Sequence, residues 1–153
     1  MENSKLITGG EFLVKETDPA DVFIPEEFDE EQKLIGQTCQ DFLDTEVFPV
    51  LEQIDAQEEG LMRELLVKAG ELGLLAISIP EEYEGFAQSF ITAMYANEIM
   101  GAGYSYAVTF SCHTGIGTLP ILYYGNEEQR KKYIPKLASG EMVGAYCHRR
   151  SHC

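Results

Sequence analysis

The sequence predicts an all-α protein, an antiparallel helical bundle preceded by an extended N-terminal arm. Apolar residues recur at helical spacing through most of residues 29–140. Capping side chains precede several of these stripes, and glycine or proline follows most of them. Met142–Cys147, by contrast, has the composition of the start of a β-strand. A bundle of helices is therefore expected between residues 29 and 140.

Composition limits the possible partners of the chain. Its 153 residues are 44% hydrophobic, enough for one domain with a core. The net charge of -15 opposes binding to nucleic acid or anionic membranes, which recruit lysine and arginine. No apolar run is long enough for a signal peptide or a membrane span, so a cytoplasmic protein without a disulfide framework is expected.

The first helix is expected to begin after the arm. Glycines and prolines in residues 1–28 indicate an extended segment. Asp29 and Gln32 then form the pattern of a capping box. Pro49 predicts a kink or break, because proline lacks an amide donor. The stripe before Pro49 consists of Leu34, Ile35, Cys39, Phe42, Leu43 and Val47.

The next two helices are expected on either side of a short connector. Leu61, Leu65, Leu66 and Ala69 predict a helix that ends at the glycines that follow. Leu74–Ile79 is too short for periodicity to separate a strand from a buried connector, and we favour the connector. Ser89 then caps a helix that contains Ile91, Met94, Tyr95 and Ile99 and stops at Gly101.

Three further helices complete the prediction. One runs from Ser105 to about Thr114, and a short one covers Ile121–Tyr124 after Pro120. Asn126, followed by Gln129, marks the start of the last helix. Pro135 is expected to disturb the turn around Ile134.

The sequence offers few candidates for a catalytic nucleophile, a general acid or base, or a metal ligand. No phosphate-binding loop, nucleophile elbow or zinc-protease motif is present, and we assign no catalytic residue. His113 follows Cys112, but adjacent helical positions do not face each other, so a hydrogen-bonded structural histidine is favoured over a ligand role. Four possible metal ligands crowd into seven residues without the spacing of zinc sites, and no metal site is assigned: Cys147, His148, His152 and Cys153.

Two stretches carry a family resemblance. Gly73–Gly85, with the sequence GLLAISIPEEYEG, and His113–Glu141, which begins HTGIGTLPILYYGNEEQ, resemble the N-terminal helical domain of the acyl-CoA dehydrogenases. The resemblance covers residues 29–147, and the arm is most similar to the very-long-chain branch. Glu84 stands where the family usually has a second glycine.

The resemblance stops at Cys147. The family continues there with Leu-Thr-Glu-Pro and a loop of a β-domain that contacts the flavin, whereas this chain has His148. Residues 148–153 therefore form a non-family tail, for which a frameshift and a cloning scar are the two explanations. The reading frame downstream in the gene distinguishes them.

The resemblance implies a function for the parent protein. Intact family members use FAD and a glutamate base to oxidise a fatty acyl-CoA between its α and β carbons, and pass electrons to an electron-transferring flavoprotein. This chain alone is expected to bind no FAD and to be inactive. By resemblance, one wall of the acyl pocket consists of Met94, Tyr95, Glu98, Val108, Thr109 and Cys112.

Other roles stay open at this point. Leu61, Leu65 and Leu72 serve either flavoprotein docking or the core, and the core is favoured. Apolar surface left exposed could join copies into a homo-oligomer. The alternative function is a non-enzymatic helical module that binds an acyl ligand or a protein partner.

Overall fold

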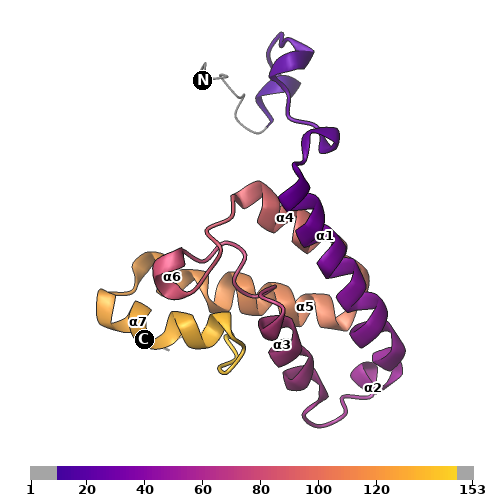
Figure 1. The fold of residues 1–153 in the computed structure, drawn as a ribbon, viewed down its shortest axis with the longest axis vertical. Coiled ribbons are helices and arrows are strands. Elements are labelled where there is room, and N and C mark those ends of the chain that lie inside the picture. Colours follow the sequence, from indigo (N-terminus) through magenta and orange to yellow (C-terminus); the bar gives the residue numbers. More distant parts are fainter. Residues whose placement is uncertain (1–9, 148–153) are drawn as a thin grey trace, which may run out of the picture.

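The computed structural model describes residues 10–147 and shows an all-helical fold (Figure 1). No strand occurs among these residues. The predicted fold class is confirmed. The α-helices are α1 Glu30–Phe42, α2 Leu51–Asp55, α3 Leu61–Glu71, α4 Phe90–Met100, α5 Ser105–Ser111, α6 Leu119–Tyr124 and α7 Glu127–Ala138.

The described part of the arm extends away from the helices (Figure 1). It contains three short 3-10 turns, Glu11–Leu13, Pro19–Asp21 and Pro25–Glu27, and none of them contains a buried residue. The arm meets the bundle at Phe28, whose ring stacks on Tyr95 of α4 with 4.4 Å between the ring centroids. The arm therefore contributes nothing to the core.

Side-chain caps fix the starts of α1 and α7. The Gln32 backbone N–H donates to Asp29 Oδ1 at 2.8 Å, and the Asp29 N–H donates to Gln32 Oε1 at 3.0 Å. Asn126 and Gln129 form the same reciprocal pair at 2.9 Å in both directions. These bonds satisfy amide groups that have no partner within a helix, as the sequence predicted.

Pro49 changes the type of helix instead of ending it. After α1 the chain widens into a π-helical turn, Leu43–Val47, tightens into a 3-10 turn, Phe48–Val50, and continues as α2. Proline supplies no amide hydrogen, so the regular series of backbone hydrogen bonds of an α-helix cannot continue unchanged through Pro49. The expected interruption is confirmed in this form.

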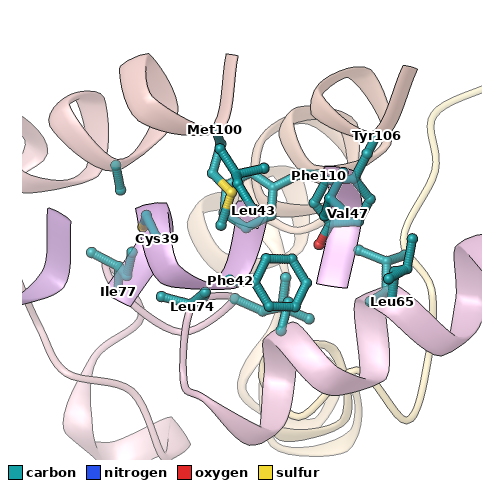
Figure 2. Close-up of a cluster of buried hydrophobic side chains, with 14 of the residues drawn as sticks. Cys39, Phe42, Leu43, Val47, Leu65, Leu74, Ile77, Met100, Tyr106 and Phe110 are labelled. Atoms are coloured by element: carbon teal, nitrogen blue, oxygen red, sulfur yellow. The ribbon is translucent and has the colours of Figure 1, made fainter. Parts of the chain in front are cut away.

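The larger of two apolar clusters joins the first five α-helices, α1 to α5. Figure 2 shows Phe42, Leu43 and Val47 meeting Leu65 of α3 and side chains of α5. A second, smaller cluster lies between α6, α7 and the segment before α4, with Ile134 and Leu122 among its buried residues. The connector Leu74–Ile79 is irregular and mostly buried, as predicted.

One expectation about a single segment is wrong. Met142–Cys147 forms no strand, because a strand requires a neighbouring strand and none occurs in residues 10–147. Pro135 lies inside α7, which continues past it to Ala138, and the disturbance expected around Ile134 stays a prediction. The helix predicted from Ser105 to about Thr114 begins at Ser105 as expected, and it changes from α-helix to π-helix at Cys112–Gly117. There the Thr118 hydroxyl donates to the His113 carbonyl at 2.7 Å and takes part in ending the regular ladder.

The hydroxyl of Tyr106 gives a prediction about the core. Tyr106 is fully buried, and its Oη has no hydrogen-bond partner among the described residues. Burial raises the pKa of this phenol, which therefore stays neutral. Tyr106→Phe should leave the free energy of unfolding unchanged or raise it by about 1 kcal/mol, because a buried unpaired hydroxyl is costly. Urea denaturation measures the change, and a loss of stability would indicate a hidden partner.

Candidate functional site

Helix α4 has apolar side chains on every side, which is unusual for a helix at a surface. Ala96 and Met100 are buried in the core. On other faces Phe90 is 73% exposed and Met94 is 44% exposed. A helix that is hydrophobic all round is normally covered on all sides. The outer face of α4 is therefore the strongest indication of a functional surface on this domain.

A hollow of about 330 Å³ lies beside this face. It is bounded by α4, by α5 with the turn that follows it, by the connector after α3, and by Leu119 and Tyr123 of α6. The Ser111 hydroxyl donates to Asn97 Oδ1 at 3.2 Å and links α5 to α4 at the hollow. Much of the remaining lining is apolar: Leu74, Leu75, Ile77, Phe90, Ala93, Met94, Ala96, Phe110, Leu119 and Tyr123.

Only one of the six residues assigned to an acyl pocket wall lines this hollow, and it is Met94. Tyr95 faces α1, where a Cβ atom on Gly36 would lie 2.5 Å from its ring. Glu98 is exposed. Val108 is 64% exposed, and Thr109 and Cys112 are partly buried. The structure thus does not gather the six residues into one closed pocket.

Sequence reasoning missed several residues at the hollow. They are Phe90 and Asn97 on α4 and Ser111 and Thr114 on and after α5. A signal was present, because positions 90, 94 and 97 and positions 111 and 114 are three or four residues apart and share a helix face. The choice of face could not be made without knowing which side of each helix packs inward.

His113 is a buried structural residue. Its Nε2 lies 2.9 Å from the Leu137 carbonyl oxygen, and its Nδ1 accepts the Gly144 N–H at 3.0 Å. Burial lowers the pKa of His113, although the Leu137 hydrogen bond opposes the change. This hydrogen-bonded role agrees with the favoured prediction. Cys39 is also buried, which raises the pKa of its thiol to about 12 and leaves it without nucleophilic character.

The lining of the hollow beside α4 lacks the groups that hold the pyrophosphate of a cofactor such as FAD. Proteins hold a pyrophosphate with arginine, lysine or backbone amides at a helix N-terminus. The lining of the hollow contains no arginine or lysine among the described residues. Within residues 10–147 no cluster of histidine, cysteine and carboxylate side chains could hold a metal. His148, His152 and Cys153 of the candidate metal set, and the whole tail 148–153, lie outside the described residues.

The part of the chain that the structure describes contains no helix long and apolar enough to cross a membrane. The cytoplasmic location expected from the sequence stays a prediction.

The fold is that of a helical domain, and the exposed apolar face of α4 is a surface on which another apolar group could pack. Residues 29–141 match the family model of the acyl-CoA dehydrogenase N-terminal domain. The chain belongs to this family.

Known proteins agree with this assignment. The chain is 40% identical over 138 residues to a Bacillus subtilis (strain 168) protein named "Probable acyl-CoA dehydrogenase", covering 90% of this chain and 23% of that protein. It is 44% identical, with a TM-score of 0.84, to an acyl-CoA dehydrogenase from Bacillus anthracis complexed with FAD, covering 89% of this chain and 24% of that one. This chain thus spans about a quarter of the length of these two relatives.

A third match concerns electron transfer. It is a chain of a structure described as the electron transferring flavoprotein of Acidaminococcus fermentans. The identity is 28% and the TM-score is 0.69, and the match covers 78% of this chain and 32% of that one. The relatives reported above give no support to the alternative of a non-enzymatic helical module.

Proposed function

We propose that this chain is the N-terminal part of a flavin-dependent acyl-CoA dehydrogenase and supplies one apolar wall of the cavity for the acyl chain. The observation that carries the proposal is the exposed apolar face of α4, with Phe90 and Met94, beside the hollow against α5. Burial of a methylene group contributes about 0.8 kcal/mol, so such a face suits a fatty acyl chain. In this proposal the described residues supply the wall, and they supply neither the flavin site nor the base that the reaction requires.

Helix α5 is the second part of the proposed wall. Val108 is 64% exposed, and Thr109 and Cys112 are partly accessible on neighbouring positions of the same helix. None of the three side chains is bulky, which leaves space for a long acyl chain. Together with Met94, Tyr95 and Glu98, these residues form the proposed acyl pocket wall.

A hybrid enzyme tests the proposed wall. Residues 29–147 would replace the matching part of the Bacillus anthracis acyl-CoA dehydrogenase, which is known in complex with FAD. The hybrid should oxidise acyl-CoA substrates. Val108→Trp in the hybrid should lower kcat/KM for long chains by about fourfold for each methylene excluded. It should leave short chains nearly unaffected.

A matched variant controls for the added indole. Leu34 lies on α1, is 67% exposed and does not line the hollow, so Leu34→Trp adds the same bulk at an exposed position outside the proposed wall. This variant should keep the chain-length profile of the hybrid. Equal loss of kcat/KM for short and long substrates in Val108→Trp would contradict a wall at α5.

The partner of the electron-transfer step is the second element of the proposal. Leu65 is buried in the core and is excluded from docking, and Leu61 is partly buried against it. Leu72 is 51% exposed beside a hollow of about 280 Å³ that Phe86 also lines. We assign Leu72 and this hollow as the contact for an electron-transferring flavoprotein. Homo-oligomer formation through the exposed apolar surface stays a prediction.

A further inference from the structure

The chain after α7 folds back onto the π-helical turn Cys112–Gly117. Gly140 makes the reversal possible with a φ of 77°, in the left-handed region. The Met142 N–H donates to the Lys136 carbonyl at 3.0 Å, and the Gly144 N–H donates to His113 Nδ1 at 3.0 Å. Among hydrogen bonds of the described residues, the bond to His113 is the last attachment before the exposed residues that follow.

Both ring nitrogens of His113 are used, and this fixes its protonation. Nδ1 accepts a hydrogen bond from Gly144, so it carries no proton. Nε2 lies 2.9 Å from the Leu137 carbonyl oxygen, which can only accept, so Nε2 carries the proton and donates. The ring is therefore neutral while the segment Glu141–Cys147 is attached. It joins three parts of the chain, the π-helical turn, the end of α7 and this segment.

The segment fits the turn in one position. A Cβ atom on Gly117 would lie 2.5 Å from the Gly144 carbonyl carbon, and one on Gly144 would lie 3.1 Å from the Gly117 carbonyl carbon. The two backbones pass each other at a distance that only glycine allows. A shift of Gly144 by even one residue would place a side chain in this contact. The His113 bond and the glycine contact therefore act together.

We propose that His113 is a proton-operated latch that holds Glu141–Cys147 against the bundle when neutral and releases this segment when protonated. A proton on Nδ1 replaces the acceptor with a second donor that points at the Gly144 N–H. The ring then can no longer accept the bond that holds the segment. The latch is independent of the proposed function and concerns the point at which the chain leaves the domain.

Burial sets the pH range of the latch. It lowers the pKa of His113 below the ordinary value of 6.5, because a charged ring is poorly solvated in the interior. The attached form is thus fully present above pH 6.5 and is lost as the pH falls below this value toward the lower pKa of the folded state.

The altered pKa of His113 does not come from a charged side chain nearby. The two causes of the altered pKa are burial and the Leu137 carbonyl. Lys136 and Glu141, beside the segment, pair with each other at 2.7 Å and are both exposed. The other titratable groups on the elements packed against His113 are Cys112, Tyr106, Tyr123, Tyr124, Glu127, Glu128, Arg130, Lys131, Lys132, Tyr133, Tyr146 and Cys147.

Nuclear magnetic resonance on the whole chain labelled with nitrogen-15 tests the latch. At pH 7.5, long-range spectra of the ring should show a proton on Nε2 and none on Nδ1. The Gly144 amide should be protected from hydrogen exchange, and its protection factor should fall by up to about tenfold between pH 6.5 and pH 5.5, because each pH unit below the ordinary pKa of 6.5 favours release about tenfold. The Phe110 amide should stay protected over the same range. The titration should stop near pH 5.5, because the isoelectric point of about 4.4 favours precipitation.

A non-titrating variant separates the latch from general effects of pH. His113→Asn retains an acceptor near the position of Nδ1 and cannot be protonated, so Gly144 protection should no longer depend on pH. A proton found on Nδ1 at pH 7.5, or constant Gly144 protection between pH 7.5 and pH 5.5, would overturn the proposal. The measurements on the unaltered chain decide the question even if the variant does not fold.

Discussion

Phe42→Ala is expected to lower the free energy of unfolding by about 4 kcal/mol. Phe42 is 1% exposed, and its ring lies 5.6 Å from that of Tyr106 in the core shared by α1, α3 and α5 (Figure 2). Truncation removes apolar contacts and leaves a cavity that close-packed neighbours cannot fill completely. Guanidinium denaturation followed by circular dichroism at 222 nm, the usual wavelength for helices, measures the loss.

Phe90→Ala is the matched control for this prediction. It removes the same ring from α4, but Phe90 is 73% exposed and lies at the proposed functional face. The free energy of unfolding should change by less than about 0.5 kcal/mol. Similar losses for Phe42→Ala and Phe90→Ala would show that the apolar face is part of the core, and would remove the main support for the proposed wall.

Gly70→Ala is expected to destabilise the chain by about 3 kcal/mol, although alanine normally favours a helix. Gly70 is in the last turn of α3, and a Cβ atom there would lie 2.2 Å from the Ser139 carbonyl oxygen and 2.5 Å from its carbon. Both atoms belong to the backbone after α7 and cannot rotate away. Thermal unfolding should show a clearly lower midpoint for this variant.

Gly101→Ala supplies the contrasting result. Gly101 follows α4, and a Cβ atom at this position would meet no atom of the rest of the chain within 4 Å, apart from its chain neighbours and its own helix backbone. Alanine should stabilise the chain by about 0.5 kcal/mol, because it restricts the unfolded chain. If Gly70→Ala were as stable as Gly101→Ala, the close contact between α3 and the chain after α7 would be wrong.

Local signals predicted the helices and their starts. Asp29 caps α1 together with Gln32, and Asn126 caps α7 together with Gln129. The two members of each pair are close in sequence, so the sequence alone shows where these helices begin. Met142–Cys147 was misjudged as the start of a strand. A strand depends on a partner elsewhere in the chain, which local composition does not reveal.

The residues of the candidate site were harder to predict from the sequence than the helices were. Met94 was found, whereas Phe90 and Asn97 were missed, because the inward side of α4 is set by its packing against α1. The π-helical turn at Cys112–Gly117 also turns His113 toward Leu137 and Gly144, residues distant in sequence. Tertiary packing chooses among faces that periodicity leaves equivalent.

The absorbance spectrum and activity of the purified chain test the central claim, that it is a folded N-terminal domain without its own flavin or catalysis. The chain would be incubated with FAD, freed of unbound FAD, and mixed with a long-chain acyl-CoA and a dye that accepts electrons. We predict helical circular dichroism, no flavin band near 450 nm, the usual position for oxidised flavin, and no reduction of the dye. A bound flavin band with reduction that depends on acyl-CoA would contradict the account.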